Sequence, residues 1–283
     1  MNLSQLNSDY WSQLCGSRIA HRLGITAADP SAVETFDKWF FSFYPYVADE
    51  TFIPWSSLES SRVLEIGLGY GTTTRRLDKK AKEVVACDIA LAPVVFSRST
   101  TQRVAGAQAS VCNLPFRSNS FDVVISLGCL HHTGDLRGSI GECFRVVRPG
   151  GTVVMMVYNR YSYKKFIVSP ITTIRSFWHE LRGNPWHRAG ETVKVRVAHF
   201  WDRNTEGSAP PHTEFASKRG LTKDLASATS VRTSLTNVDD ITGLFPLRLQ
   251  RRGFEVFRRR LLNSFLAHKL GLDIYCVAVK ASN

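Results

Sequence analysis

The chain has 283 residues and a formal net charge of +12, from 36 Lys and Arg against 24 Asp and Glu. Its hydrophobic content of 43%, with 11% aromatic residues, is that of a folded globular protein and excludes a disordered or low-complexity chain. No apolar run approaches the roughly 18 residues that a membrane-spanning helix requires, and the length suits one core domain with a large cap.

Residues 1–58 are predicted to form a helical lead-in. Within them, residues 35–46 are rich in aromatic side chains, which indicates a core-facing helix or, as the alternative, one wall of a substrate pocket. The first residues show neither the basic nor the apolar region of a secretory signal, and the six cysteines form no Cys-x-x-Cys pair. Both features favour a cytoplasmic protein with reduced thiols.

A strand, a glycine loop and a helix are predicted at residues 63–74, which read Val-Leu-Glu-Ile-Gly-Leu-Gly-Tyr-Gly-Thr-Thr-Thr. Glycine has no Cβ and tolerates a positive φ, so a ligand can approach the main chain at Gly67, Gly69 and Gly71. The helix that follows presents unpaired N–H groups at its first turn. This order predicts a nucleotide-type cradle in an open α/β sheet.

The second predicted strand, at residues 83–88, ends in Asp88, seventeen residues after Gly71. A carboxylate at the tip of this strand is where such folds hold ribose hydroxyls. The glycine spacing is Gly-x-Gly-x-Gly, with threonine at position 72, whereas a dinucleotide-binding fold requires Gly-x-Gly-x-x-Gly. The loop therefore indicates a ligand other than a dinucleotide.

Two further strands are expected in the same sheet. Residues 121–127 form a near-continuous apolar run, as expected for a strand buried on both faces of a parallel sheet. Pro149, Gly150 and Gly151 end a helix, and residues 152–157 form the next buried strand. Strands and helices alternate from residue 62 to residue 158, which predicts a parallel sheet wrapped by helices.

Several short motifs follow one another along this core. They are Glu65 two residues before the glycine loop, Asn-Leu-Pro-Phe at 113–116, Phe-Asp-Val-Val at 121–124, Leu-His-His at 130–132 and Arg-Pro-Gly-Gly at 148–151. With them, residues 59–158 resemble the class I S-adenosylmethionine-dependent methyltransferases, in the small-molecule branch called the methyltransferase 11 family. The resemblance implies an α/β fold with a Rossmann-like, mostly parallel sheet, an antiparallel last strand and a helical cap insertion. It also implies S-adenosyl-L-methionine as cofactor and S-adenosyl-L-homocysteine as product.

By this resemblance, the glycine loop cradles the methionine part of the cofactor, Asp88 bridges its ribose hydroxyls and Ile89 packs on its adenine. Ser110 stands where the family commonly has an acid that contacts the adenine amine, so affinity depends more on backbone groups. The cofactor-binding residues implied are Glu65, Gly67, Leu68, Gly69, Tyr70, Gly71, Asp88, Ile89, Ser110, Val111, Leu127 and His132. Residues 9–22 resemble the lead-in of some members, in which the N-terminal segment forms a lid over the cofactor.

Residues 159–228 are predicted to form the cap that holds the substrate. Helices are expected at residues 161–168 and 171–181, on either side of Pro170, and at residues 222–228. Residues 191–200 are expected to form a helix or a strand. Residues 210–217, Pro-Pro-His-Thr-Glu-Phe-Ala-Ser, resemble an element of related methyltransferases.

Residues 229–283 are predicted to close the sheet with two strands, at 230–237 and 273–280, separated by an insertion at 241–270. The insertion carries seven basic residues against one acidic, and residues 157–200 carry eight against two, so these two segments hold the excess positive charge. The apolar residues of the insertion fit one helical face. Such a helix packs on the cap with a solvated basic face or, as the alternative, lies on an anionic membrane surface as a peripheral membrane element.

Candidate catalytic residues follow the fourth strand. Methyl transfer from a sulfonium is an in-line displacement, so a base is needed only when the acceptor arrives protonated. His131 and His132 lie where the methyl group is expected to emerge, and His212, Glu214 and Tyr158 are further candidates from the cap. The alternative is a structural His-His pair with one imidazole packed against the cofactor loop. No cluster of His, Asp or Glu has metal-ligand spacing.

The sequence therefore predicts a methyltransferase that modifies a small or lipid-like acceptor at oxygen, nitrogen or carbon. The fourth strand ends in Ser-Leu-Gly-Cys at 126–129 and lacks the Asn/Asp-Pro-Pro-Tyr element typical of enzymes that act on nucleobase amines. One alternative is an RNA or other nucleic-acid methyltransferase that uses the basic segments on phosphates. Another is a non-catalytic S-adenosylmethionine-binding protein. The sequence leaves the acceptor and the oligomeric state open.

Overall fold

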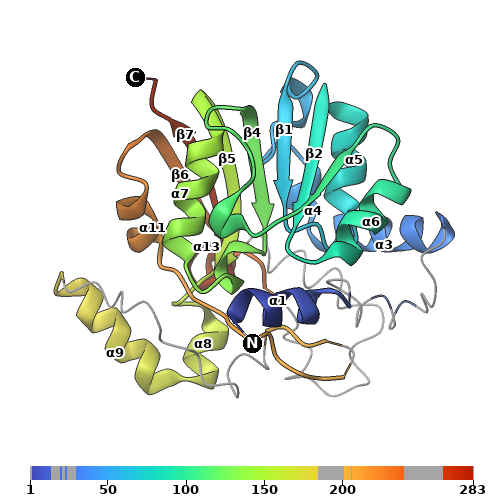
Figure 1. Ribbon diagram of the computed structural model, residues 1–283. Helices are drawn as coiled ribbons and strands as arrows, with labels where there is room; N and C mark the ends of the chain where they lie inside the picture. The colour runs from blue at the N-terminus through green and yellow to red at the C-terminus, as the bar shows by residue number, and fades with distance from the viewer. Residues whose placement is uncertain are drawn as a thin grey trace.

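The computed structural model describes residues 2–13, 20, 23, 30–183, 201–204, 206–238 and 264–282. In this part of the chain, seven strands form one sheet, in the order β3-β2-β1-β4-β5-β7-β6, with helices on both faces (Figure 1). The strands are β1 Arg62–Ile66, β2 Glu83–Asp88, β3 Ala105–Gln108, β4 Phe121–Leu127, β5 Val147–Tyr158, β6 Ala228–Thr236 and β7 Asp273–Lys280.

Strand β7 is the antiparallel member of the sheet. It runs against both β5 and β6, whereas the neighbours from β3 through to β5 pair in parallel. The predicted α/β class, with a mostly parallel sheet and an antiparallel last strand, is confirmed. The predicted strands at 83–88, 121–127 and 273–280 match β2, β4 and β7 at both ends.

Two apolar layers enclose the sheet because successive residues of a strand point to opposite faces. On β1, Val63 packs in one cluster with Leu77 of α5 (Thr72–Lys80), whereas Leu64 packs in another with Ile140 of α7 (Leu136–Val146). Helix α6 (Leu91–Ser99) lies on the same face as α5, and α11 (Lys218–Asp224) on that of α7.

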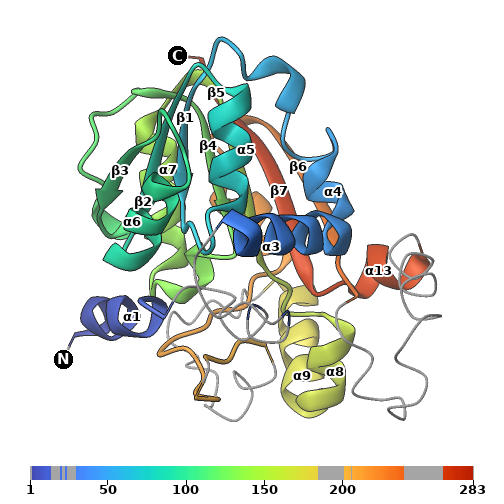
Figure 2. The ribbon, with the colours of Figure 1, turned by 90° about the vertical axis from the view of Figure 1, so that its right-hand side faces the viewer.

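The lead-in supplies helices α1 (Leu3–Trp11), α3 (Pro30–Phe43) and α4 (Pro45–Ala48) and the short 3-10 turn η1 (Trp55–Ser57). Figure 2 shows α3 crossing the lower end of α5, and α1 lying below the lower ends of β2 and β3. The predicted helix at residues 35–46 is confirmed for most of its length. Helices α1 and α3 therefore lie where they can close the carboxyl end of the sheet.

The cap contributes α8 (Tyr163–Val168) and α9 (Pro170–Leu181), as predicted from the sequence on either side of Pro170. The Ser162 hydroxyl accepts from the Lys165 N–H at 3.3 Å and so caps α8, and Pro170 occupies the first turn of α9, where a missing N–H costs nothing. Both views place these helices beneath the lower end of the sheet (Figures 1 and 2).

The predicted helix at residues 222–228 is wrong in position. Helix α11 begins at Lys218, four residues before the predicted start at 222. The Ser217 hydroxyl accepts from the Gly220 N–H at 3.0 Å and so caps the helix at this earlier position. It ends at Asp224, and Ala228 already opens β6. The β-branched residues of this segment favour the strand.

Some predictions fall outside the described residues. They are the element at 191–200 and most of the basic insertion at 241–270, of which only the end is described, as α13 (Phe265–Leu270). Over the residues that the structure describes, the helices are too short or too polar to cross a membrane.

Candidate active site

A cavity of about 280 Å³ lies at the carboxyl ends of β1, β2 and β4. In a parallel sheet these ends lie at one edge, where open α/β folds bind ligands. The loops after the three strands form the floor, and α1, α3 and the cap supply the remaining walls. Eleven of the twelve predicted cofactor residues line it: Glu65, Gly67, Leu68, Gly69, Tyr70, Asp88, Ile89, Ser110, Val111, Leu127 and His132.

The glycine loop has the backbone conformation that the sequence predicts. Gly67, Gly69 and Gly71 have φ values of +80°, +51° and +67°. A Cβ on Gly67 would lie 2.4 Å from Cβ of Cys129, so only glycine lets the loop pass the end of β4. Gly71, the twelfth predicted residue, does not line the cavity: it is the N-cap of α5, and a Cβ there would lie 2.6 Å from the Ser97 hydroxyl.

The carboxylate of Asp88 both holds the glycine loop and lines the cavity. Oδ2 accepts from the Leu68 N–H at 2.8 Å and Oδ1 accepts from the Ala90 N–H at 2.9 Å. Burial raises the pKa of Asp88, and these backbone donors oppose that rise. A carboxylate offers about four acceptor positions, so Asp88 keeps capacity for a ligand hydroxyl beside its backbone donors.

Glu65 is a buried carboxyl at the end of β1, with a side chain only 4% exposed. Its Oε2 finds no hydrogen-bond partner among the described residues. Burial raises the pKa of Glu65 to about 8, against the opposing influence of Thr74 and of the Arg75 guanidinium. An unsatisfied buried acceptor that lines a cavity suits a cationic or donor group of a ligand.

Aromatic side chains of α3 and its C-terminal side form the wall above the loop: Phe36, Trp39, Phe40 and Tyr44. Phe36 stacks on Tyr70 of the glycine loop with ring centroids 4.4 Å apart. The half-exposed Asp37 accepts from Nε of the buried Arg75 at 2.8 Å, which fixes α3 to α5. The helix at residues 35–46 therefore both packs on the core and lines the pocket.

Helix α1 closes the opposite side. Asn7 donates from Nδ2 to the His132 carbonyl at 2.9 Å, and the Ser8 hydroxyl donates to the Ile89 carbonyl at 3.3 Å. The Trp11 ring lies 4.9 Å from the His132 ring. The N-terminal helix thus contacts the loops after both β2 and β4, whereas most of the lead-in at residues 9–22, which is expected to form a lid, lies outside the described residues.

His132 lies at a polar junction between core and cap, on the 3-10 turn η3 (Leu130–His132). Its Nδ1 is 2.8 Å from the His212 carbonyl oxygen and 3.3 Å from the Thr213 hydroxyl. Its Nε2 is 3.5 Å from Oδ2 of Asp202, and that oxygen accepts from the Tyr158 hydroxyl at 2.7 Å. Core and cap thus meet in one cluster of side chains.

The position of the ring proton follows from these contacts. A carbonyl oxygen only accepts, so Nδ1 of His132 must be the protonated donor toward His212. In the neutral ring Nε2 is then an unprotonated acceptor. The Asp202 carboxylate is placed to stabilise the positive charge that the ring acquires when Nε2 takes a proton.

The partners of His132 have fixed protonation states. Burial acts to raise the pKa of Asp202, but the protonated form of the His132 imidazole and the Tyr158 hydroxyl outweigh it, and the pKa is lower than usual. Burial, with the Asp202 charge beside it, raises the pKa of Tyr158 well above its ordinary value. At neutral pH the pair is therefore a carboxylate held by a neutral hydroxyl.

His131 lies behind His132 and does not line the cavity. Its ring is fully buried, 4.2 Å from the His132 ring and 4.0 Å from the Tyr158 ring, and neither nitrogen has a partner among the described residues. Burial, followed by the neighbouring His132, lowers the pKa of His131 well below its ordinary value. This imidazole is a neutral, packed ring.

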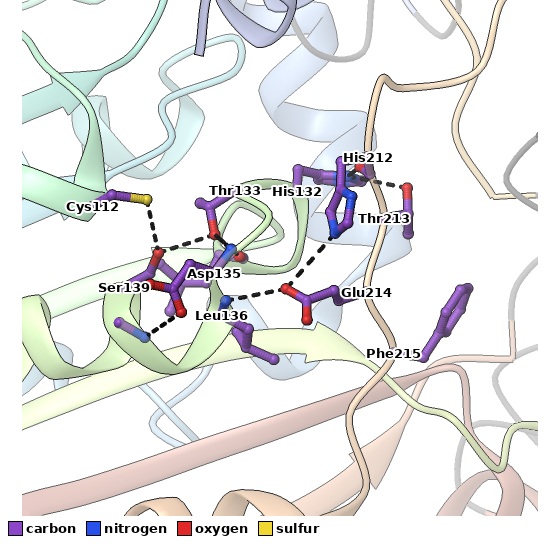
Figure 3. Close-up of polar contacts among 12 residues, drawn as sticks. Cys112, His132, Thr133, Asp135, Leu136, Ser139, His212, Thr213, Glu214 and Phe215 are labelled. Atoms are coloured by element: carbon purple, nitrogen blue, oxygen red, sulfur yellow. Dashed lines mark hydrogen bonds and ion pairs between the residues drawn. The ribbon is translucent and has the colours of Figure 1, made fainter. Parts of the chain in front are cut away.

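His212 contributes its carbonyl, whereas its ring turns away from the cavity toward Glu214 (Figure 3). The two side chains are 3.8 Å apart, and Glu214 accepts from the Leu136 N–H at 3.1 Å, at the first turn of α7. The Glu214 N–H also donates to the His131 carbonyl at 2.7 Å. The predicted segment at 210–217 therefore clamps the cap onto η3 and α7.

Sequence reasoning missed Asp202, Asn7 and Trp11, all of which line the cavity. Asp202 lies in a stretch without helix or strand, so no periodicity marks it. Asn7 and Trp11 lie on one side of α1, four residues apart, a spacing that could have indicated a shared face. Among the residues described, no group of three or more His, Cys, Asp or Glu side chains could hold a metal ion.

Comparison with known proteins gives a family match for the core. A family model described as a methyltransferase domain matches residues 64–155. A protein of Mycolicibacterium smegmatis named as a probable S-adenosylmethionine-dependent methyltransferase is 33% identical over 101 residues, 36% of this chain and 39% of that protein. The demethylmenaquinone methyltransferase of Tropheryma whipplei is 28% identical over 110 residues, 38% of this chain and 45% of that enzyme.

A mouse protein named as probable tRNA methyltransferase 9B is 30% identical over 165 residues, 50% of this chain and 35% of that protein. The chain thus spans less than half the length of these curated relatives. Among solved structures, a chain in the complex of the Haloferax volcanii Trm112 methyltransferase activator with a methyltransferase has a TM-score of 0.57 at 16% identity, over 98% of both chains. At that identity the likeness establishes the fold.

Proposed function

We propose that this chain, whose residues 64–155 belong to the methyltransferase 11 family of S-adenosylmethionine-dependent methyltransferases, methylates a small or lipid-like acceptor held between core and cap. The observation that carries the proposal is the environment of His132. This imidazole lines the cavity, donates from Nδ1 to a backbone carbonyl and turns Nε2 toward the Asp202 carboxylate. Such a group can accept a proton from the acceptor and stabilise the resulting charge.

The cradle fits the family's cofactor, S-adenosylmethionine, which supplies an electrophilic methyl group when bound. The positive-φ loop from Gly67 lets a ligand lie against the main chain, and the open acceptor positions of Asp88 suit a ribose diol. The unpartnered Oε2 of Glu65 suits the cationic methionine end. Ser110 and Val111 line the remaining edge, where adenine would lie beside Ile89.

Bound S-adenosylmethionine would supply the methyl group and would leave as S-adenosylhomocysteine when its sulfur–methyl bond breaks. Nε2 of His132 would take the proton of the acceptor hydroxyl. Asp202 stabilises the imidazolium, and Tyr158 keeps Asp202 in place through its 2.7 Å hydrogen bond. Asn7 and the His212 carbonyl hold the ring and its loop from two sides. Most of the acceleration would come from alignment, to which proton removal adds roughly 10²- to 10⁴-fold.

The acceptor side of the cavity favours a neutral, apolar molecule. Aromatic side chains of α1 and α3 form its walls, and no Lys or Arg is among the described lining residues. Buried aromatic walls with few polar groups are typical of sites for small apolar ligands. The quinone-type substrate in the name of the Tropheryma relative supports this class of acceptor.

An RNA acceptor is the second candidate, because the chain carries a net charge of +12 and one relative is named for tRNA. Phosphate contacts by Lys and Arg would then supply affinity, with a steep dependence on salt. The lack of Lys and Arg on the described cavity walls favours the apolar acceptor.

The test uses S-adenosylmethionine with a labelled methyl group and three acceptor pools: hydroxylated aromatics with alkyl chains of increasing length, a total lipid extract and total RNA. The proposal expects label in the organic phase, and loss of that label for His132→Ala while S-adenosylhomocysteine still binds in calorimetry. Label in RNA alone would overturn the proposed acceptor class. Cofactor binding without transfer to any pool would favour a non-catalytic binding protein.

A further inference from the structure

Helix α9 has an inverted orientation, with polar side chains inward and apolar side chains outward. Thr173 and Ser176 are buried, whereas Ile171 is 81% and Trp178 55% exposed. A surface helix ordinarily turns its apolar stripe to the core. Along α9 the spacing of these residues puts the polar pair and the apolar pair on opposite sides of the helix.

Hydrogen bonds from the cap hold α9 in this orientation. The Thr173 hydroxyl donates to the Lys165 carbonyl at 3.2 Å. Glu180, the one acid of the helix, accepts from the Tyr161 hydroxyl at 2.5 Å and from the Ser217 hydroxyl at 2.8 Å. Rotating the helix to bury its apolar side would break these bonds, so the exposure of that side is built into the fold.

The exposed apolar residues form one ridge. Ile171, Ile174, Trp178 and Leu181 follow one another at intervals of three or four residues, and all four are exposed. Contiguous exposed apolar residues on a folded protein mark an interaction surface. We call these four residues the α9 ridge.

Positive charge flanks the α9 ridge. Arg175 and Arg182 are exposed, and with Trp178 and His179 they line an open depression beside the ridge. Glu180 is turned inward, so the outer side of α9 combines apolar and basic groups. This is the composition of a helix that lies in the headgroup region of an anionic membrane.

The position of the ridge suits a flat surface. Both views show α8 and α9 at the end of the molecule beyond the carboxyl ends of the strands (Figures 1 and 2). Helix α1, which closes the cavity, lies toward the same end. A membrane on this side would therefore lie at the cavity end of the molecule.

We propose that the α9 ridge docks on the surface of an anionic phospholipid bilayer, with α9 parallel to the membrane plane. The ridge enters the boundary between headgroups and acyl chains, with Trp178 at the depth that tryptophan prefers, and Arg175 and Arg182 contact lipid phosphates. A second copy of the chain is a weaker candidate occupant, because a two-fold contact through the ridge would bring the same arginines together. The inference is independent of the proposed methyl transfer.

The test is cosedimentation of the full chain with vesicles of phosphatidylcholine alone and of phosphatidylcholine mixed with phosphatidylglycerol. We expect binding to the mixed vesicles at least about tenfold tighter than to the neutral ones. Arg175→Glu with Arg182→Glu should weaken it by about 30-fold or more, from roughly 1 kcal/mol per arginine. Ile171→Ser with Trp178→Ser should weaken it by at least about tenfold.

The matched control is Leu91→Ser with Val95→Ser, which removes two comparably exposed apolar side chains from α6 and should leave vesicle binding unchanged. S-adenosylhomocysteine binding by calorimetry reports that each variant is folded. Equal binding to both vesicle types, or equal loss in the α6 control, overturns the proposal. A second result would also overturn it: the parent chain does not bind vesicles but forms a dimer in solution, and the Ile171/Trp178 variant does not form that dimer. The ridge would then be the contact with a second copy of the chain.

Discussion

The two sides of the cavity are built from different parts of the chain. The side proposed for the cofactor consists mainly of loops within residues 65–111, with Glu65 and Asp88 at the ends of adjacent strands. The side proposed for the acceptor consists of side chains from separate segments, such as Trp11, His132 and Asp202, which lie far apart along the chain. A site made from consecutive strand ends can be recognised in a sequence, whereas one assembled across a cap cannot.

This difference has a functional counterpart. The cofactor side should govern binding, and the acceptor side should govern turnover. A substitution on one side should therefore leave the property of the other side nearly unchanged.

His132→Ala should have the largest effect. Loss of the base should lower turnover by roughly 10²- to 10⁴-fold, while the dissociation constant for S-adenosylhomocysteine changes only a few-fold. Steady-state kinetics and calorimetry measure the two quantities. The exposed His268→Ala is the control and should match the parent. If cofactor affinity falls in parallel with turnover, His132 belongs to the cofactor side.

Glu65→Gln should change the pH dependence of stability in the protein without cofactor. Because the pKa of Glu65 is raised from 4.5 to about 8, folding takes up a proton between these values, and the free energy of unfolding falls as pH rises through that range. The Gln variant should lack this fall, a difference on the order of a few kcal/mol at pH above 8. Urea unfolding across the pH range measures it, and parallel curves would show that Glu65 is not buried as described.

Asp88→Asn should weaken cofactor binding by roughly 10- to 100-fold, the value of one or two charge-assisted hydrogen bonds. Turnover at saturating cofactor should stay close to that of the parent. Asp122→Asn is the matched control, because Asp122 lies at the opposite end of the sheet, where it accepts from the Arg62 N–H. Unchanged affinity in the Asp88 variant would remove Asp88 from the cofactor side.

Tyr158→Phe should have the smallest effect, a fall in turnover of about three- to tenfold, because it removes only the hydroxyl that holds Asp202. In an Asp202→Asn background the same change should cost almost nothing, since the interaction is already lost. A double-mutant cycle on turnover measures this coupling. Additive losses would mean that Tyr158 acts independently of Asp202.

The extent to which the sequence predicts this protein follows the same division. Strand β4 was predicted to the residue because a strand buried on both faces of a sheet is a continuous apolar run with sharp ends. The helix predicted at 222–228 begins at Lys218 in the structure because Ser217, within the segment 210–217, is its N-cap. Both the apolar run of β4 and the serine cap of α11 are local signals that the sequence contains.

The acceptor side carried no such signal. Asp202 belongs to no helix or strand, and only the fold brings it to His132. The sequence offered His131 and His132 as equivalent candidates, yet one ring is buried behind the other. What separates them is packing against Tyr158 and the cap, which depends on contacts between distant segments and not on spacing along the chain.

In the proposed mechanism the cap fixes a proton of His132 on Nδ1, and Nε2, beside Asp202, takes up the proton of the acceptor. Nitrogen-15 NMR of the imidazole, with the His132 signals assigned by their loss in His132→Ala, measures this directly. We expect a protonated Nδ1, because the His212 carbonyl 2.8 Å away can only accept. A neutral ring with its proton on Nε2 would contradict it.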